Sequence, residues 1–409
     1  MGTTLYYIII GIVFFDFVLE RWLDHLNASR FRAKLPEELQ GIFDEEKYKK
    51  QQEYLLVKHR FGLISSTFSF IILLLMLVLG GFAIVDELSR TWIDHPVGTP
   101  LVFFGIIGLA SGIINIPFSW YSTFVIEERF GFNKTTPKIF VLDLLKGWLL
   151  GALMGGLLLG LITWIYNATQ EMFWIYAFIL VASFTIFIAM FYSNLIVPLF
   201  NKQTPLEEGE LKEAIRSFAM KVGFKLDNIF MIDGSKRSTK ANAYFSGFGA
   251  KKRIVLYDTL INDLTIEELV AVLAHEIGHF KKKHVLRGMV LSLIQTAFIF
   301  YIFGRIAASP ALGIALGAGQ TSFHLALIAF GILYTPISLV LGMGMNVFSR
   351  RNEYQADDFA GSNYNHEALI SALKKLSANN LSNLTPHPTY VFFHYSHPPL
   401  LERLRNLRK

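Results

Sequence analysis

The chain of 409 residues contains no cysteine and few charged residues. Without cysteine it can form neither disulfides nor thiolate metal sites, so a bound metal has to be held by histidine and carboxylate side chains. Charged residues make up 17% of the chain, whereas soluble domains carry about 25%. Much of the surface is therefore expected to face something other than water.

Apolar residues are abundant instead. They account for 53% of the chain, and 37 of them are phenylalanine, a residue suited to lipid-facing and interfacial positions. The formal net charge of +6 would also fit a nucleic-acid partner. The basic residues are better explained as flanks of membrane segments, because they cluster between long apolar runs, and no nucleic-acid partner is expected.

Seven segments have, or nearly have, the length and apolarity needed to cross a bilayer, which takes about 17 to 25 residues. The loop of residues 24–61 carries eight Lys and Arg residues, whereas the loop of residues 86–100 has only Arg90. This alternation continues along the chain. By the positive-inside rule the N-terminus lies outside the cytosol, and the first, third and fifth loops lie inside it. The segments are residues 5–23, 62–85, 101–126, 147–166, 173–199, 285–303 and 323–348, and Pro336 is expected to kink the last one.

The motif that carries chemistry is HEIGH at residues 275–279. On a helix His275 and His279 share one face, with Glu276 beside them. Two imidazoles one turn apart can bind one zinc ion, and the carboxylate can take a proton from zinc-bound water. Chance would produce such a motif on the order of once per hundred chains of this length. The uninterrupted apolar run before it, opened by the capping-box pair Thr265 and Glu268, makes chance a poorer explanation.

The fifth loop, residues 201–283, is predicted to fold as a small unit. Residues 207–222 have helical spacing, with Gly223 as C-cap, and residues 228–232, 243–245 and 253–257 are short strand-like runs. An edge strand of such a sheet could bind an extended peptide. His279 lies about six residues before the sixth apolar segment, which places the metal on the order of 10 Å from it. We therefore expect a substrate that is membrane-bound or delivered to the membrane surface.

A catalytic zinc needs a third protein ligand. Val285 occupies the position where a metzincin has its third histidine, and His284 lies off the ligand face, so we interpret His284 as a solvated interfacial residue. Glu353 is the better candidate, because it follows the seventh segment at the same cytosolic face. The alternative is an exposed acidic helix start. Asp357, one turn later, can hold the ring N–H of a ligating histidine.

Three motifs together resemble the integral-membrane CAAX prenyl proteases, the Ste24-type zinc metallopeptidases of family M48. These are HEIGH at 275–279, EYQAD at 353–357 and HPPLLERL at 397–404. The stretches SKRS at 235–238 and NAYF at 242–245 resemble the substrate strand of that family, although Ala241 stands where the family often has serine. The resemblance covers essentially the whole chain.

The resemblance implies a role for each candidate residue. The developing oxyanion needs a cationic or hydrogen-bonding partner, and a histidine and an arginine six residues apart around a Pro-Pro turn could converge on it. For His397 alone, an ordinary loop histidine is the alternative. The implied roles are zinc ligation by His275, His279 and Glu353, general base by Glu276, support of a ligand by Asp357, substrate pairing by Asn242 and Ala243, and oxyanion stabilisation by His397 and Arg403.

The expected fold is mainly α: a polytopic membrane protein with about seven transmembrane helices around a chamber, plus a small cytosolic α+β, gluzincin-like zinc-protease unit. Residues 1–200 would hold five membrane helices and their cytosolic loops, and residues 201–284 the zinc-protease unit. Residues 285–349 would hold the last two membrane helices. Residues 350–409 would form a cytosolic segment that completes the active site.

The expected function is zinc-dependent removal of the aaX tripeptide from prenylated CAAX proteins, with one Zn²⁺ per chain. The active site would face the cytosol, from the endoplasmic reticulum of a eukaryote or the inner or plasma membrane of a bacterium. Two alternatives stay open: an HtpX-type protease that degrades membrane proteins, and a transporter or channel with a structural zinc. Glu276 separates the second alternative from an enzyme, because a structural site has no use for a base.

Overall fold

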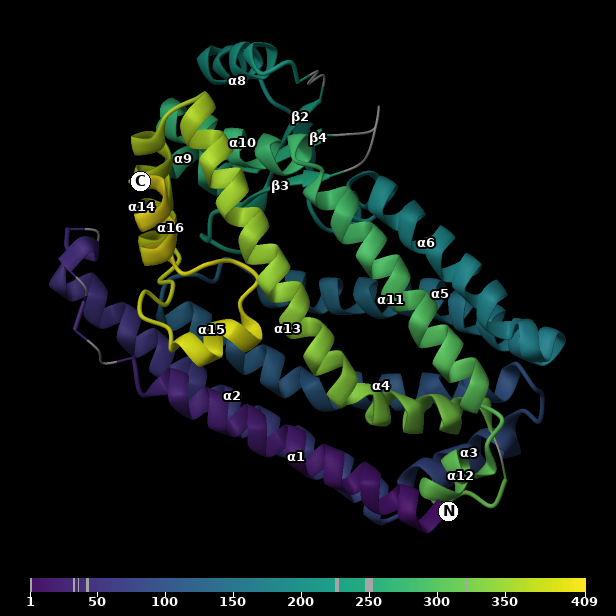
Figure 1. Cartoon of the computed structure of the whole chain (residues 1–409). Coiled ribbons are helices and arrows are strands. Elements are labelled where there is room, and N and C mark those ends of the chain that lie inside the picture. Colours follow the sequence, from purple (N-terminus) through teal and green to yellow (C-terminus); the bar gives the residue numbers. More distant parts are fainter. Residues whose placement is uncertain are drawn as a thin grey trace.

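Long helices form most of the molecule, and a small sheet lies at one end of it (Figure 1). The computed structural model describes residues 2–31, 34–35, 37–41, 44–224, 228–246, 253–320 and 322–409. The N-terminus lies at the end away from the sheet, and the C-terminus lies near the sheet (Figure 1). The segments that carry the HEIGH motif and the C-terminal motifs are therefore gathered at one end of the helical frame.

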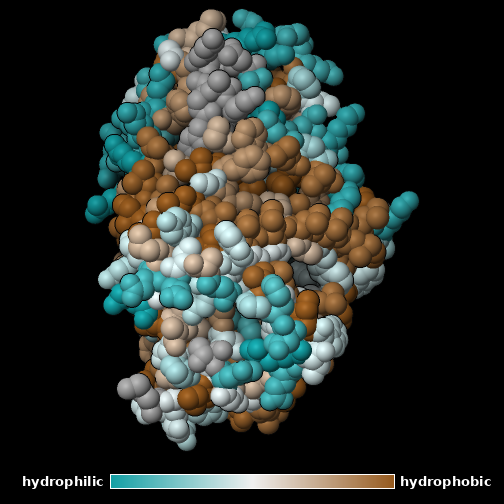
Figure 2. Space-filling view, turned by 90° about the vertical axis from the view of Figure 1, so that its right-hand side faces the viewer, coloured by the Kyte–Doolittle hydropathy of each residue, from teal (hydrophilic) through white to brown (hydrophobic). Residues whose placement is uncertain are grey.

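Six stretches of the described chain are long and apolar enough to cross a membrane, and one of them, Pro137–Phe200, contains two long helices. No more than 22% of each apolar window is buried, so these helices present apolar side chains outward. Figure 2 shows the result on one face, a broad hydrophobic band with hydrophilic surface on either side of it. The seven expected segments correspond to α1 (Gly2–Ala28), α2 (Glu45–Val78), α4 (Gly98–Tyr121), α5 (Pro137–Thr169), α6 (Phe173–Leu195), α11 (His284–Ile306) and α13 (Phe323–Asn363).

The predicted second segment, residues 62–85, is wrong at its C-terminal end. Helix α2 stops at Val78, and Gly80 adopts a left-handed conformation with φ of +66° before α3 (Gly81–Trp92) begins. Glycine takes this conformation without a steric penalty. Helix α3 then packs inward through Phe82, Ala83 and neighbouring polar groups, so it does not extend the membrane helix.

The seventh segment continues beyond its predicted end. Helix α13 runs without interruption from Phe323 to Asn363 and contains Pro336. Figure 1 shows this helix bending in its N-terminal part and then running straight toward the sheet. Glu353 and Asp357 therefore lie on the extension of a membrane helix, a rigid support for two side chains of a candidate site.

The sheet has four strands in the order β1-β2-β4-β3. Strands β2 (Ile229–Ile232) and β4 (Arg253–Tyr257) pair in parallel, and the other neighbours are antiparallel. Three of the strands fall where the sequence predicts them. Strand β1 (Gln203–Pro205) was not expected, because three residues that include glutamine, threonine and proline lack the apolar alternation of a strand. Strand β3 (Ala243–Ser246) forms one edge of the sheet.

Helix α10 (Ile266–Lys281) lies at the centre of a core formed by the sheet, α8 (Glu210–Lys221) and α14 (His366–Asn379). The predicted capping box is confirmed: Thr265 accepts a hydrogen bond from the N–H of Glu268, and Glu268 accepts one from the N–H of Thr265. Glu268 also accepts hydrogen bonds from Ser371 and Lys375 of α14. The shorter helices are α7 (Val197–Phe200), α9 (Asp258–Asp263), α12 (Pro310–Ala315), α15 (Pro388–His394), α16 (Leu400–Leu407), the π-helical η2 (Ser122–Glu127) and the 3₁₀ turns η1 (Glu37–Leu39), η3 (Gln170–Met172) and η4 (Gly234–Lys236).

Candidate active site

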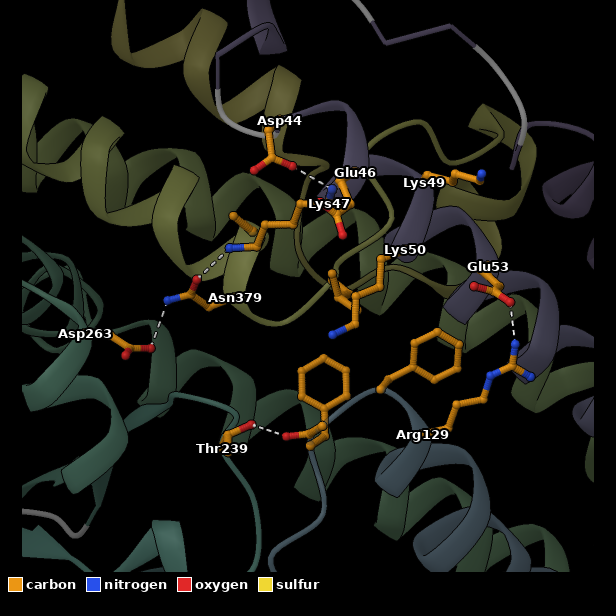
Figure 3. Close-up of a pocket in the computed structure, with 15 residues that line it drawn as sticks. Asp44, Glu46, Lys47, Lys49, Lys50, Glu53, Arg129, Thr239, Asp263 and Asn379 are labelled. Carbon is orange, nitrogen blue, oxygen red and sulfur yellow. Dashed lines mark hydrogen bonds and ion pairs between the residues drawn. The ribbon is translucent and has the colours of Figure 1, made fainter.

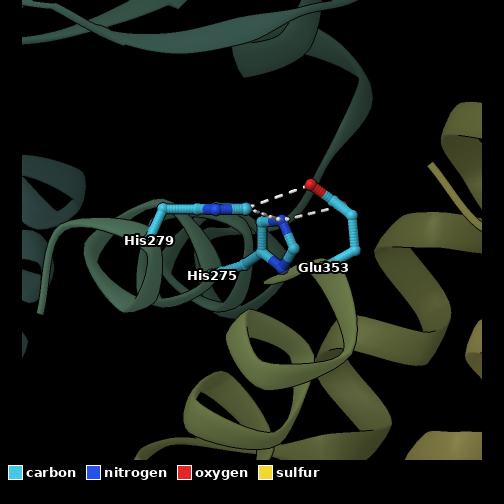
Figure 4. A group of neighbouring side chains, drawn as sticks. All are labelled: His275, His279 and Glu353. Atoms are coloured by element: carbon cyan, nitrogen blue, oxygen red, sulfur yellow. Dashed lines mark hydrogen bonds and ion pairs between the residues drawn. The ribbon is translucent and has the colours of Figure 1, made fainter. Parts of the chain in front are cut away.

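The site is built where α10 crosses α13, and a glycine sets how closely the two helices approach. A Cβ placed on Gly278 would lie 3.2 Å from both Cα and the carbonyl oxygen of Ala356, and 3.1 Å from the ring of Phe359. Only a residue without a side chain allows this contact without displacement. As a result Glu353, one turn before Ala356 on α13, lies beside the HEIGH face of α10 (Figure 4).

His275, His279 and Glu353 converge on one point. The Nε2 atoms of the two histidines are 3.1 Å apart. Oε1 of Glu353 lies 3.2 Å from Nε2 of His279. Oε2 of Glu353 lies 3.5 Å from Nε2 of His275. Two nitrogens bound to one tetrahedral zinc ion at 2.0–2.1 Å would be about 3.3 Å apart. The spacing and the His₂Glu donor set therefore fit zinc, which these three residues would hold.

Asp357 and Arg403 support His275 at Nδ1, the ring nitrogen that does not face Glu353. Asp357 is fully buried, and its Oδ1 lies 2.9 Å from Nδ1 of His275. Arg403, on α16, donates Nε–H to Oδ2 at 2.8 Å and Nη2–H to Oδ1 at 2.5 Å of the same carboxylate. Burial opposes protonation of His275, but the hydrogen bonds to Asp357 and Glu353 outweigh it and raise its pKa to about 9. The carboxylates thus hold this ring firmly in place.

His397 contacts the carboxylate of the candidate ligand Glu353. Its Nδ1 lies 2.9 Å from Oε2 of Glu353, while 65% of its side chain is exposed. The guanidinium of Arg403 is close as well, with Nη1 3.9 Å from the same oxygen. The two residues therefore converge, as the Pro-Pro turn suggests, although Arg403 is mainly engaged by Asp357. Their action on an oxyanion stays a prediction.

Glu276 is half-buried on α10. Among the described residues, none forms a hydrogen bond or an ion pair with its carboxylate, although the nearby charge of Arg403 interacts with it electrostatically. A carboxylate without such partners can take up a proton without first breaking a bond. This arrangement suits a general base but does not test the role.

Asn242 and Ala243 lie at the exposed edge of the sheet. The carbonyl of Asn242 accepts a hydrogen bond from the N–H of Tyr257 on β4. Because backbone groups alternate in direction along a strand, the N–H and C=O of Ala243 point away from β4. Its N–H lies 2.8 Å from Oδ1 of Asn242. Because that N–H donates to the Asn242 side chain, the edge offers the carbonyl of Ala243, rather than that of Asn242, for pairing with a peptide.

His284 is not the solvated residue that its spacing suggests. It is 4% exposed, and it contacts His279 and Gln355 through its two ring nitrogens. No direct signal in the sequence marks this position, because a residue five positions after His279 would face elsewhere if α10 continued. The structure instead ends α10 at Lys281 and starts α11 at His284.

A cavity of about 850 Å³ lies elsewhere on the same end of the molecule, between the start of α2, the loop after η2 and the end of α14. No candidate metal ligand lines it. Figure 3 shows Lys47 bound to Asn379, which in turn binds Asp263. These bonds tie the first turn of a membrane helix to α9 and α14, which pack around the HEIGH helix.

Comparison with known proteins gives matches along nearly the whole chain. Residues 24–202 match the family described as CAAX prenyl protease N-terminal, five membrane helices, and residues 205–409 match peptidase family M48. CAAX prenyl protease 1 of Saccharomyces cerevisiae is 35% identical over 98% of this chain and 94% of its own length. The homolog from Homo sapiens is 33% identical over 97% and 94%. The crystal structure of S. mikatae Ste24p matches with a TM-score of 0.94 and 34% identity, covering 99% of both chains.

Proposed function

The chain belongs to peptidase family M48, and we propose that it removes the C-terminal tripeptide from prenylated CAAX proteins by zinc-dependent hydrolysis. It is an integral, multi-pass membrane metallopeptidase. The observation that carries the proposal is the His275, His279 and Glu353 group, because it lies beside the starting point of one membrane helix and on the extension of another. A protease centre in this position suits a substrate whose lipid stays in the bilayer.

The donor set fits zinc, which when bound supplies Lewis acidity toward the scissile carbonyl and toward a water molecule. Glu276 accepts the proton from the attacking water and returns it to the leaving amine. His397 donates a hydrogen bond to the developing oxyanion from its exposed position. Arg403 adds positive charge near that oxyanion and holds Asp357 against His275.

The substrate peptide is proposed to extend the sheet at β3. The outward C=O of Ala243 pairs with its backbone, and the side chain of Asn242, which accepts a hydrogen bond from the N–H of Ala243, adds a further polar contact. The positive-inside distribution of Lys and Arg supports a site on the cytosolic side. That side is the one on which prenylated C-termini would be presented, at the endoplasmic reticulum of a eukaryote or the plasma membrane of a bacterium.

The test uses purified full-length protein with matched farnesylated and unprenylated CAAX peptides, with and without a chelator. We expect chelator-sensitive cleavage of the farnesylated peptide before its last three residues. Equal cleavage of the unprenylated peptide and of unfolded membrane proteins would instead favour a quality-control protease. The family membership already sets aside a transporter or channel with a purely structural zinc.

Glu276→Gln separates metal binding from catalysis. The variant is expected to keep about one zinc per chain and to lose cleavage by about 10²–10⁴-fold, because amide nitrogen and oxygen cannot accept the proton from water. Zinc content by metal analysis and hydrolysis of the farnesylated peptide are measured on the same sample. Unchanged proteolysis with metal bound would rule out Glu276 as the base.

A further inference from the structure

His279 has a partner behind it, as His275 does. Nδ1 of His284 lies 3.1 Å from Nδ1 of His279, and Nε2 of His284 lies 3.1 Å from Oε1 of Gln355. Gln355 is on α13, two residues after Glu353. A continuous path of polar contacts therefore runs from α13 through His284 to the ring of His279, on the side of the ring remote from Glu353.

An unusual turn brings His284 to this position. Lys283, between α10 and α11, adopts a left-handed conformation with φ of +58° and ψ of +30°. Residues other than glycine, asparagine and aspartate seldom take this backbone conformation, because Cβ crowds the following carbonyl. The turn ends α10 and redirects the chain so that His284, the first residue of α11, lies against His279. Strain at Lys283 is thus coupled to the burial of His284.

The hydrogen-bond inventory fixes the direction of this path. If Nε2 of His279 faces the metal, its Nδ1 carries the hydrogen and has to donate it. Nδ1 of His284 is then the acceptor, so its own hydrogen is on Nε2 and is donated to Oε1 of Gln355. Every nitrogen on the path is satisfied with both imidazoles neutral.

We propose that His284 and Gln355 are positioning residues that fix the tautomer and ring orientation of His279. The role rests on the proposed metal function, and it is the counterpart of Asp357 and Arg403 acting on His275. The two supports differ in charge. Three carboxylates, Glu276, Glu353 and Asp357, already surround the site, and they balance a divalent cation together with Arg403. A neutral support at His279 avoids a further buried negative charge.

The proposal is tested by zinc affinity, measured on the full-length protein by competition with a chromophoric chelator. His284→Phe keeps the bulk of the ring but removes the acceptor, and we expect the dissociation constant to rise about 10–100-fold. His284→Asn places Oδ1 close to the former Nδ1 position, so it should restore most of the affinity. Gln355→Leu leaves both histidines in place and should raise the dissociation constant by a smaller factor, about 3–10-fold.

Controls separate this proposal from the proposed function. His275→Ala should lose zinc, and the thermal unfolding of each metal-free variant reports folding. Wild-type affinity in both His284→Phe and Gln355→Leu, with zinc lost in His275→Ala, overturns the positioning role and leaves the protease intact. A second result also overturns the positioning role: zinc affinity falls in His284→Phe, is not restored in His284→Asn, and is unchanged in Gln355→Leu. His284 would then contribute packing alone. If His284→Phe does not fold, Gln355→Leu decides. Absence of zinc from the wild-type protein contradicts the proposed function itself.

Discussion

Arg403 illustrates how a single residue can be assigned two roles that different measurements separate. Its guanidinium forms a two-point contact with the fully buried Asp357, which in turn holds His275. An arginine that served only the oxyanion would change catalysis alone. An arginine that fixes a metal-supporting carboxylate would change metal affinity as well, because an unpaired buried carboxylate is costly.

Arg403→Lys is the corresponding test, because lysine keeps the charge but lacks the planar fork. We expect zinc affinity to fall about 10–100-fold and kcat to fall with it. Both are measured on the same preparation, with cleavage assayed at saturating zinc. A drop in kcat with wild-type zinc affinity would show that Arg403 acts on the reacting substrate and does not position His275 through Asp357.

The pH dependence of metal binding follows from His275. Its pKa in the metal-free protein is raised from 6.5 to about 9, so near neutral pH the ring is protonated. A metal can bind only the neutral imidazole. Zinc binding at pH 7 should therefore release about one proton from this residue, and the apparent affinity should rise about tenfold for each pH unit up to about 9.

Calorimetry in buffers of different ionisation enthalpy measures the released proton, and Glu276→Gln, which keeps the ligands, is the control. The stability of the metal-free protein changes with pH in the opposite direction to the zinc affinity. A raised folded-state pKa stabilises the metal-free protein below pH 6.5, and this contribution is lost as the pH rises through about 9. Metal binding without proton release at pH 7 would mean that His275 is neutral in the metal-free protein.

At the scale of elements, the crossing of α10 and α13 decides whether the three candidate ligands, His275, His279 and Glu353, meet. Gly278→Ala adds a methyl group against the backbone of Ala356 and the ring of Phe359. Because backbone cannot rotate aside as a side chain can, α13 has to shift and carry Glu353 with it. We expect a loss of about 1–3 kcal/mol of stability and weaker zinc binding.

Gly288→Ala on α11 is the matched control, because nothing lies within 4 Å of the added Cβ. It should leave zinc affinity unchanged, since it removes only the flexibility of a helical glycine. Thermal unfolding and chelator competition are measured for both variants. Equal behaviour of the two variants would show that the helix crossing tolerates a methyl group and does not set the ligand geometry.

These elements also show what the sequence can predict. The HEIGH helix and both residues of its capping box could be predicted, because the signals are local: a Thr–Glu pair and the apolar run that follows it. Glu353 could be placed near the histidines, because the apolar segments on either side of the two motifs were expected to end at one face of the membrane. The contact of His284 could not be predicted, because it depends on the left-handed conformation of Lys283, which nothing in the KKKH run indicates. The break at Gly80 was missed for a similar reason, since the apolar pattern continues across it.

At the scale of the whole molecule, contacts distant in sequence tie the unit around α10 to the membrane helices. Arg237, between η4 and β3, donates two hydrogen bonds to Asp143 on α5, 94 positions away, at 2.7 and 2.9 Å. Lys240 binds Tyr54 and Glu127 at 2.8 Å each. Lys240 lies shortly before β3, the proposed substrate strand. Membrane helices and substrate strand are thus held in one arrangement, which sequence spacing alone could not reveal.

The orientation of this whole assembly in the membrane is open to direct measurement, because the chain has no cysteine and any introduced thiol is unique. Glu207→Cys lies in the exposed loop after β1, on the end of the molecule that carries the candidate site, and Gln320→Cys lies in the exposed loop between α12 and α13. In sealed vesicles with the cytosolic face outward, a membrane-impermeant maleimide should label Glu207→Cys at once but Gln320→Cys only after detergent. The unmodified chain gives the blank. The reverse pattern would place the protease centre on the non-cytosolic side, where the charge distribution predicts it should not be, and the proposal for prenylated cytosolic substrates would fail with it.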